Sequence, residues 1–583
     1  MKSLRRLLPF LSPYLFSIGS GFFTFFIARF FEIATIWCVA KGIDVIGQLI
    51  LKEEPEYSIE LVTAGIVASV LLRMIFVIHA RRAVRRVAIA VSYDLRQKLF
   101  SSVQKQGHDF FARMGVGDIM TRAIQDISLV QRLIAFGAFM FVIMVYAPFF
   151  ALIGMLSKSI MLTLLILPTL PLIFLYARHI ARFLSISSLE VQERLSDLAS
   201  HVQENLSGIR TIQAQAQEKN EIARFWQTND QYGQAFYEQA RLNSLMMAWM
   251  PFFASCAQLL IIIYGGTLVL EGSMSVGDLV FFLACLGMLL QPIRMAGMFV
   301  TIVQRSAVAT DRLYEIYDAV PEIADEPTDL TPAQIQGEFE LRNLSYSYPN
   351  TNVKVLEDIC LKVEAGESIG IVGRVGSGKS TLLKQFTRML NTSRGSLFVD
   401  GYDVCDYPLS QLRSQIAQVL QDPFLFGEPL KNNISYDEPE RELTLIWDSA
   451  DAAALKQTIE DFPDQMDTMV GERGVTLSGG QKQRATLARG LIRNAPVLIL
   501  DDCFSSVDTE TEEHILSRLS AIRGGKTTIL VSHRVSTLRH SDRIVVLEEG
   551  RIVEVGSHEF LIQKNGIYAE LERVQTRGVN AGE

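Results

Sequence analysis

The chain has 583 residues, of which 49% are hydrophobic, and it carries 55 Lys and Arg against 63 Asp and Glu. This length predicts two or more domains, and the net charge of −8 argues against a nucleic-acid partner, because phosphate backbones bind to basic faces. Apolar residues are concentrated in residues 1–305 and charged residues in the rest, so we expect a membrane domain followed by a soluble one. The six cysteines form no CxxC pair, which predicts neither a disulfide framework nor a zinc site.

Six segments of the first half have the length and composition of membrane-spanning helices, which need about 20 mostly apolar residues. The third and fourth are separated only by Ser157 and Lys158, which predicts a tight hairpin. We therefore predict an α-helical transmembrane domain over residues 1–305, with six helices and two long intracellular loops. The predicted spans are Tyr14–Val39, Ile59–Ala80, Leu133–Ser157, Ser159–Ala177, Leu242–Leu270 and Leu279–Val303.

The distribution of Lys and Arg predicts the orientation of these spans. Basic residues precede the first span and follow the second, whereas the connection between the two is acidic, with Glu53, Glu54, Glu56 and Glu60. Because cytoplasmic loops carry the excess of positive charge, both termini are expected in the cytoplasm. The first apolar run lacks the small-residue pattern of a cleaved leader, and the compact chain favours a bacterial inner membrane. The basic residues are Lys2, Arg5, Arg6, Arg81, Arg82, Arg85, Arg86 and Arg96.

Some charged residues lie within predicted spans, among them Arg29, Glu32, Arg73 and Arg294. A charge inside a membrane indicates function by default. Arg29 and Glu32 are three residues apart and can pair on one helix face, and we favour that interpretation over a substrate contact. Pro168, Pro171, Pro251 and Pro292 are expected to mark kinks.

Residues 306–337 have the composition of a linker, because prolines and acidic residues interrupt any regular pattern there. Gly337 is expected to open the soluble domain. We assign residues 338–575 to that domain and 576–583 to a C-terminal tail.

The soluble half contains a phosphate-loop motif. Ser368–Val372 has the pattern of a short buried strand, and Gly373-x4-Gly378-Lys379-Ser380 follows it directly. Glycines in such a loop let backbone N–H groups face phosphate oxygens, and the helix that follows adds its positive end. Lys379 would meet the β- and γ-phosphates, and Ser380 would ligate Mg²⁺. The predicted binding residues are Gly373, Arg374, Val375, Gly376, Ser377, Gly378, Lys379, Ser380 and Thr381.

A second apolar strand, Val497–Leu500, ends in Asp501 and Asp502. Asp501 fits the second Mg²⁺ anchor of phosphate-loop proteins. Together with the phosphate loop and the run Leu477-Ser478-Gly479-Gly480-Gln481, this strand resembles the nucleotide-binding domain of ATP-binding cassette (ABC) transporters. The combined fold expected from the resemblance is a six-span exporter-type domain joined to an α/β P-loop domain.

The resemblance implies roles for further residues. Tyr348 matches the aromatic residue that stacks on adenine, Gln421 matches the loop glutamine that senses Mg²⁺, and His533 matches the switch histidine. Ser478, Gly479, Gly480 and Gln481 match the signature that closes on the ATP of the opposite subunit. The resemblance extends to Ser505–Asp508, the loop at the dimer interface, to Val470–Gly474, a loop typical of exporters, and to Phe110–Asp126 and Gly208–Glu218, the two intracellular loops.

Asp502 is the departure from the family pattern, because that position is usually the catalytic glutamate. The aspartate carboxylate stops about 1 Å short of the glutamate position, and a displacement of that size can cost about 10²-fold in rate. An equally competent aspartate is the alternative. With an intact signature, the chain looks like the degenerate-site subunit of heterodimeric bacterial multidrug exporters. Retention of His533 leaves a slow homodimer open.

We therefore expect an ABC-type transporter ATPase that uses ATP and Mg²⁺ to export an amphipathic or hydrophobic drug, lipid or peptide from the lipid membrane. Its partner would be a second half-transporter, a heterodimer being favoured. A siderophore importer of exporter fold, and a regulated channel or receptor regulator, are the alternatives. The six spans exclude a soluble ABC ATPase, and the few residues before the first span disfavour a peptidase-containing exporter. The substrate is not indicated.

Overall fold

The chain divides into two compact units in a computed structural model. Residues 2–323, 334–349, 351, 353–471 and 477–580 are described, except the side chains of residues 2, 177, 293, 294 and 576–580. The first unit consists of Met1–Gln104 and Val116–Ala319, and the second of Lys105–Gly115 and Val320–Glu583. The chain thus enters the second unit twice.

The described part of the first unit holds six helical segments that are long and apolar enough to cross a membrane, which confirms the six predicted spans. They are Ser3–Ile50, Ile59–Gln104, Val116–Lys158, Ile160–Ser207, Glu218–Leu270 and Val276–Tyr317. Their helices are α1 (Lys2–Arg5), α2 (Leu8–Leu11), α3 (Leu15–Ile50), α4 (Ile59–Gln104), α6 (Val116–Thr121), α7 (Ile127–Phe141), α8 (Ala147–Lys158), α9 (Ile160–Ile166), α10 (Thr169–Ser207), α11 (Ile209–Ala214), α12 (Glu218–Leu260), α13 (Gly266–Leu270) and α14 (Val276–Tyr317).

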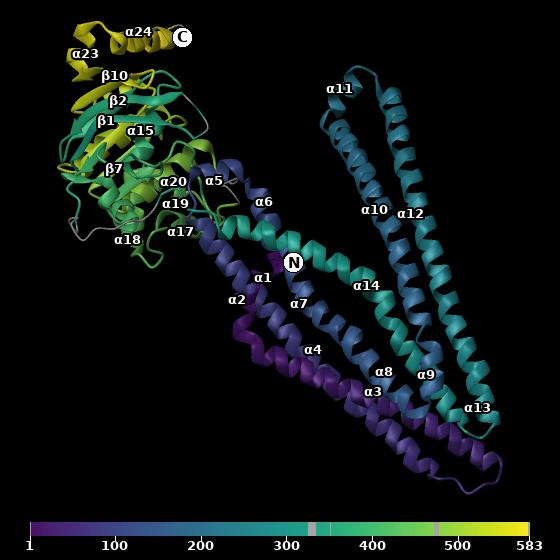
Figure 1. Ribbon diagram of the computed structural model, residues 1–583. Helices are drawn as coiled ribbons and strands as arrows, with labels where there is room; N and C mark the ends of the chain where they lie inside the picture. The colour runs from purple at the N-terminus through teal and green to yellow at the C-terminus, as the bar shows by residue number, and fades with distance from the viewer. Residues whose placement is uncertain (1, 324–333, 350, 352, 472–476, 581–583) are drawn as a thin grey trace. The chain divides into compact units, whose positions relative to one another are not determined.

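Several of these helices are much longer than a bilayer requires. Helix α4 has 46 residues, or about 70 Å at 1.5 Å per residue, against a hydrocarbon core about 30 Å thick. Helices α10 and α12 run side by side as two rods, and the short α11 lies at their tip (Figure 1). The predicted second loop, Gly208–Glu218, is this tip. The helices of these rods therefore continue the spans beyond the length that a bilayer requires.

The hairpin between the third and fourth spans is as tight as predicted. Only Ser159 separates α8 from α9, and it adopts an extended conformation. Its Oγ accepts a hydrogen bond from Leu162 N at 3.3 Å, which caps the new helix. The prolines fall both in breaks and within helices: Pro168 immediately precedes α10, whereas Pro251 and Pro292 lie inside α12 and α14.

The boundary of the first unit differs from the expected one at residue 305. Helix α14 continues to Tyr317, so the first part of the predicted linker is helical. The reason is a buried stripe at helical spacing, made of Ser306, Ala309, Thr310, Leu313 and Ile316. The acidic and proline-rich residues 324–333 lie outside the described residues.

Residues 105–115, expected in the transmembrane domain, belong to the second unit. They contain α5 (His108–Arg113), whose first turn is held by Glu322. The Glu322 carboxylate accepts hydrogen bonds from Phe110 N at 2.8 Å and Asp109 N at 3.3 Å. A Cβ on Gly107 would lie 2.5 Å from Glu322 Oε2, so the contact requires glycine there.

The rest of the second unit is built on two sheets. One has the strand order β2-β1-β4-β5 and is antiparallel, and the other has the order β10-β9-β3-β8-β7-β6. In the larger sheet β9, β3, β8, β7 and β6 are parallel. The strands are β1 (Phe339–Ser347), β2 (Lys354–Val363), β3 (Ser368–Val372), β4 (Leu397–Val399), β5 (Tyr402–Asp403), β6 (Ile416–Val419), β7 (Val497–Asp501), β8 (Thr527–Val531), β9 (Arg543–Glu548) and β10 (Arg551–Gly556).

Helices cover this parallel sheet, and its central strands are buried along their length, as their apolar runs predict. The loops that follow β3, β7 and β8 emerge at one edge, where ligands of such sheets bind. The helices are α15 (Lys379–Phe386), α16 (Leu409–Gln415), α17 (Leu430–Ile434), α18 (Leu443–Ala452), α19 (Lys456–Glu460), α20 (Gly479–Leu491), α21 (Thr509–Ile522), α22 (Val535–Leu538), α23 (His558–Lys564) and α24 (Ile567–Asn580).

Candidate nucleotide site

The loop between β3 and α15 has the backbone of an anion cradle. Gly378, immediately before α15, has φ +98°, a left-handed conformation that favours glycine. A Cβ on Gly373 would lie 2.1 Å from Leu547 O, so a larger residue would push the loop off the sheet. Arg374, Val375 and Gly376 at the turn of the loop are exposed, whereas Ser377 is buried.

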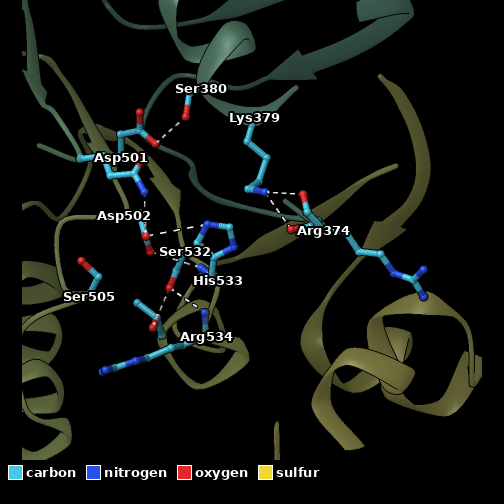
Figure 2. Close-up of polar contacts among 12 residues, drawn as sticks. Arg374, Lys379, Ser380, Asp501, Asp502, Ser505, Ser532, His533 and Arg534 are labelled. Atoms are coloured by element: carbon cyan, nitrogen blue, oxygen red, sulfur yellow. Dashed lines mark hydrogen bonds and ion pairs between the residues drawn. The ribbon is translucent and has the colours of Figure 1, made fainter. Parts of the chain in front are cut away.

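Lys379 lies inside this loop and is 6% exposed. Its Nζ donates hydrogen bonds to Gly373 O at 2.8 Å and Arg374 O at 2.9 Å (Figure 2). Burial lowers the pKa of Lys379, while the nearby Asp502 and Asp501 partly restore it. The ammonium group is therefore held against the loop backbone, and an anion bound in the loop would meet a desolvated positive charge.

Asp501 ends β7 opposite the first turn of α15. Ser380 Oγ donates a long hydrogen bond of 3.4 Å to Asp501 Oδ1. Burial raises the pKa of Asp501, which marks a carboxylate short of compensating charge. A hydroxyl and a carboxylate oxygen are the ligand types Mg²⁺ takes, so this pair fits that ion.

The Asp502 side chain, immediately after β7, contacts Gln421 and His533, which belong to two other segments. The residue is 7% exposed and has φ +47°, a left-handed conformation that Asp tolerates better than most residues. Gln421 Nε2 donates to Asp502 Oδ2 at 3.3 Å, and His533 N donates to Oδ1 at 3.4 Å. His533 Nε2 lies 3.8 Å from Oδ2. Figure 2 shows the carboxylate facing the imidazole.

Tyr348 lies just after β1 and reaches the phosphate-loop helix. Its hydroxyl lies 3.2 Å from Thr381 Oγ1. The ring packs edge-on against Tyr346, with centroids 5.3 Å apart, and lies 6.1 Å from the His108 ring of α5. This half-buried ring therefore lies beside the first turn of α15.

The signature residues form a different kind of structure. Ser478 caps α20: Gln481 N donates to Ser478 Oγ at 3.3 Å, and Ser478 N donates to Gln481 Oε1 at 2.9 Å. This reciprocal pair is a capping box. Gly480 packs against the backbone of Ser506, whereas Gly479 has more room. Among the described residues, Ser478 and Gln481 bond one another and make no hydrogen bond to the phosphate loop.

Two further residues, missed in the sequence, position this machinery. Gln483 in α20 donates from Nε2 to Ser505 Oγ at 2.8 Å and accepts from Ser506 N at 2.8 Å, joining the signature helix to the Ser505–Asp508 loop. The signal that could have found Gln483 in the sequence is a glutamine on the face of the signature helix that packs inward. Gln575 in α24 donates to His533 O at 2.6 Å and accepts from Val535 N at 2.9 Å. Gln575 lies far from His533 along the chain, so no sequence motif connects the two residues.

Part of one predicted motif lies outside the described residues. Of Val470–Gly474, residues 472–474 are not described, while Val470 is buried and its N donates to Glu428 O at 3.1 Å. The remaining candidate residues gather in three places: the phosphate loop with Tyr348 and Thr381, the Gln421–Asp502–His533 cluster next to Asp501, and the capped start of α20.

Comparisons with known proteins agree with this arrangement. Residues 18–293 match the family described as ABC transporter transmembrane region, and residues 356–505 match the family described as ABC transporter. The chain is 33% identical over 488 residues to the "Putative multidrug export ATP-binding/permease protein YgaD" of Bacillus subtilis, covering 84% of each chain. It is also 33% identical over 498 residues to an ATP-dependent lipid A-core flippase of Syntrophus aciditrophicus, covering 84% of this chain and 81% of that one.

A solved structure shares the fold. The chain is similar to a bacterial Atm1-family ABC exporter with ATP bound, with a TM-score of 0.76, 23% identity, and coverage of 98% of this chain and 99% of that one. Three findings lead to one conclusion: the six apolar helices, the phosphate loop and signature of the second unit, and the relatives that share both halves. The chain belongs to the ABC transporters, as a multi-pass membrane protein with an exporter-type transmembrane domain and an ABC ATPase domain.

Proposed function

We propose that this protein is one half of an ATP-driven exporter that moves an amphipathic or hydrophobic substrate across the membrane by alternating access. The substrate would be a drug, a lipid or a peptide. The observation that carries the proposal is the joining, in one chain, of six membrane-length helices to a cassette whose phosphate loop, Asp501 and signature are all formed. The names of two relatives, a multidrug export protein and a lipid flippase, support the same class of activity.

The cradle fits a nucleotide. Tyr348 and Thr381 would bind the adenosine end, and Gly373–Ser380 would wrap the phosphates, with Lys379 as their buried cation. Ser380, Asp501 and Gln421 would hold Mg²⁺, which supplies charge neutralisation at the phosphates when bound. His533, hydrogen-bonded through its backbone to Asp502, would contact the terminal phosphate.

Asp502 would serve as a weak general base for the attacking water. Its carboxylate lies between Gln421 and His533, and both of its oxygens make only long contacts, of 3.3–3.8 Å. Normal N–H···O hydrogen bonds measure about 2.7–3.2 Å, so the carboxylate falls short of its neighbours. That shortfall supports an impaired hydrolytic site on this chain.

The intact signature supports a partner whose ATP this chain completes. Ser478 and Gln481 form the helix cap within the chain, and the α20 N-terminus carries the partial positive charge that attracts phosphate. A heterodimer with a glutamate-bearing half-transporter follows, in which this chain holds the weak site. The His533–Asp502 proximity favours one alternative, a homodimer that uses Asp502 as a slow base.

The same proposal places both termini in the cytoplasm of a bacterial cell, with the protein in the inner membrane. Arg81, Arg82, Arg85 and Arg86 follow the second predicted span and would lie on the cytoplasmic side. The second unit would then face the cellular ATP pool.

The first test is the composition of the complex purified from its native membrane in mild detergent. A second, different half-transporter of similar mass establishes the heterodimer, whereas this chain alone establishes the homodimer. The complex is then placed in inside-out vesicles with a fluorescent amphipathic substrate. ATP-dependent uptake that is lost in Lys379→Ala supports export, and equal uptake by both proteins contradicts it.

A further inference from the structure

Charged side chains converge between the first two spans. Arg29 and Glu32 of α3 form an ion pair, as the sequence predicts, and Arg73 of α4 joins them, with its Nη2 2.8 Å from Glu32 Oε1. The two oxygens of Glu32 are thus divided between two arginines. The side chains of Arg29 and Glu32 are only 12% and 16% exposed, whereas Arg73 is 42% exposed. The side chain of Arg294 lies outside the described residues.

These residues line a cavity of about 180 Å³. On α4 its lining residues are Arg73, Val77 and Arg81, spaced by four residues, so one helix face supplies them all. Arg81 also lies over the Phe139 ring, at 5.7 Å from its centroid. On α3 the lining residues are Phe25, Ala28, Arg29 and Glu32, whose spacing also places them on one helix face. Gln291 of α14 adds an amide group to the lining.

The charges in this cavity do not balance. Arg29, Arg73 and Arg81 contribute three positive charges and Glu32 one negative charge, which leaves a net charge of +2 among the lining residues. Charges within a membrane are costly unless they are paired or serve a pathway. Glu32 is already shared between Arg29 and Arg73, and Arg81 forms no ion pair with a carboxylate among the described residues, so positive charge remains that Glu32 does not neutralise.

The size and position of the cavity limit what could supply the missing negative charge. Pockets that enclose a drug-sized ligand measure about 300–1,000 Å³, so a cavity of about 180 Å³ fits a headgroup and not a whole amphiphile. Arg81 directly follows the predicted second span, Ile59–Ala80. In the proposed orientation the cavity would therefore lie toward the cytoplasmic leaflet.

We propose that this cavity binds the anionic group, a phosphate or a carboxylate, of an amphipathic substrate that the exporter takes from the cytoplasmic side. Guanidinium groups bind such oxyanions through paired N–H donors. Arg81 and the half-exposed Arg73 are the recognition residues, Arg29 anchors Glu32, and Glu32 competes with the substrate for Arg73. This assignment rests on the proposed export function and adds the charge class of its substrate.

The test uses the full complex in nanodiscs of zwitterionic phosphatidylcholine. Four probes with one twelve-carbon tail are titrated, namely dodecyl phosphate, dodecanoate, dodecyl maltoside and dodecyltrimethylammonium, together with inorganic phosphate. Binding and stimulation of ATPase activity are measured. We expect the two anions to bind best, and inorganic phosphate to bind much more weakly, because it lacks the tail. Equal binding of inorganic phosphate and dodecyl phosphate would overturn the assignment to an amphiphile.

Variants separate recognition from structure. Arg81→Gln and Arg73→Gln should each weaken dodecyl phosphate binding about tenfold, the loss expected for one charge-assisted contact of about 1.4 kcal/mol. Glu32→Gln should strengthen it, because Arg73 is released; a purely structural pair predicts no gain. Arg85→Gln, exposed one turn further along α4 and outside the cavity, is the matched control and should not change binding.

The outcomes distinguish the cavity from the export function. Cation or neutral probes that bind as well as the anions, or anion binding unaffected in Arg81→Gln and Arg73→Gln, overturn the anion site while ATP-dependent transport stands. Loss of ATP-dependent uptake in the unmodified complex, with uptake equal to Lys379→Ala, overturns the export function itself.

Discussion

The two halves of the nucleotide machinery on this chain are held in different ways. The signature half is closed by its own hydrogen bonds, with Ser478 and Gln481 in a reciprocal cap and Gln483 bonded at 2.8 Å to the neighbouring loop. The catalytic half meets through contacts of 3.3–3.8 Å around Asp502. The half proposed to serve the partner's ATP is therefore joined by hydrogen bonds of 2.8–3.3 Å, whereas the Asp502 carboxylate in the half proposed to serve the chain's own ATP makes only contacts of 3.3–3.8 Å.

The largest effect is expected from the buried cation of the catalytic half. Lys379→Ala removes the only ammonium group that the described phosphate loop encloses, and removal of such a group at a phosphoryl centre costs about 10²–10³-fold in the rate of hydrolysis at this chain's own site. ATPase activity of the purified complex measures it. Arg374→Ala is the control, because Arg374 is 60% exposed and pairs only weakly, at 3.5 Å, with Glu570. Near-normal activity of Lys379→Ala would show that this chain's own site contributes nothing to the ATPase activity of the complex.

The signature half is tested by replacing a glycine with alanine, which adds a single methyl group. A Cβ on Gly480 would lie 2.7 Å from Ser506 O, whereas a Cβ on Gly479 would lie at an ordinary 3.6 Å from Ser506. Gly480→Ala should therefore destabilise the cassette by about 1–3 kcal/mol, as overpacking does, and Gly479→Ala should not. Thermal melting of the two variants decides it. If both melt like the parent protein, the tight seam between α20 and the Ser505–Asp508 loop is not a constraint.

The same contrast explains which features of the fold and of the site could be predicted from the sequence. Short motifs such as Gly373–Ser380 have one structural solution, because backbone N–H groups, glycine conformations and a following helix must coincide, so the loop, Asp501 and the capped signature were predictable. The six spans were predictable because apolar length alone defines them. Neither Gln575 nor Glu322 belongs to a pattern, since each acts through a contact made only on folding. The extension of α14 to Tyr317 was missed because its buried stripe includes the polar Ser306 and Thr310.

The segment 105–115 offers a smaller effect, at a distance from the phosphates. Glu322 caps α5 through Phe110 N and Asp109 N, and loss of such a cap costs about 1 kcal/mol. Because the chain enters α5 directly from α4, Glu322→Ala should reduce substrate stimulation of the ATPase while basal activity stays. Glu322→Gln, which keeps an acceptor oxygen, should recover part of the stimulation. Full stimulation in Glu322→Ala would separate this cap from coupling.

The smallest effect is expected at Gln575. Its amide supports the backbone on both sides of the switch, at His533 O and Val535 N. Gln575→Ala should lower kcat by about two- to tenfold, the equivalent of 0.5–1.5 kcal/mol for a hydrogen bond, with little change in KM. Glu570→Ala, on the same helix but exposed, is the control. A change in KM alone would place Gln575 in nucleotide binding and not in positioning His533.

The central claim is that the length of one side chain limits this chain's own site, and Asp502→Glu tests it most directly. The ATPase rate of the purified, nucleotide-binding complex is measured for the parent protein, Asp502→Glu and Asp502→Asn. The account predicts the order Glu, Asp, Asn, with a gain of up to about 10²-fold for glutamate in hydrolysis at this chain's own site, since about 1 Å of reach is restored; in a heterodimer the partner's site also turns over, so the total rate rises by less. A rate for Asp502→Glu equal to or below that of the parent protein, in a folded and partner-bound complex, would contradict it.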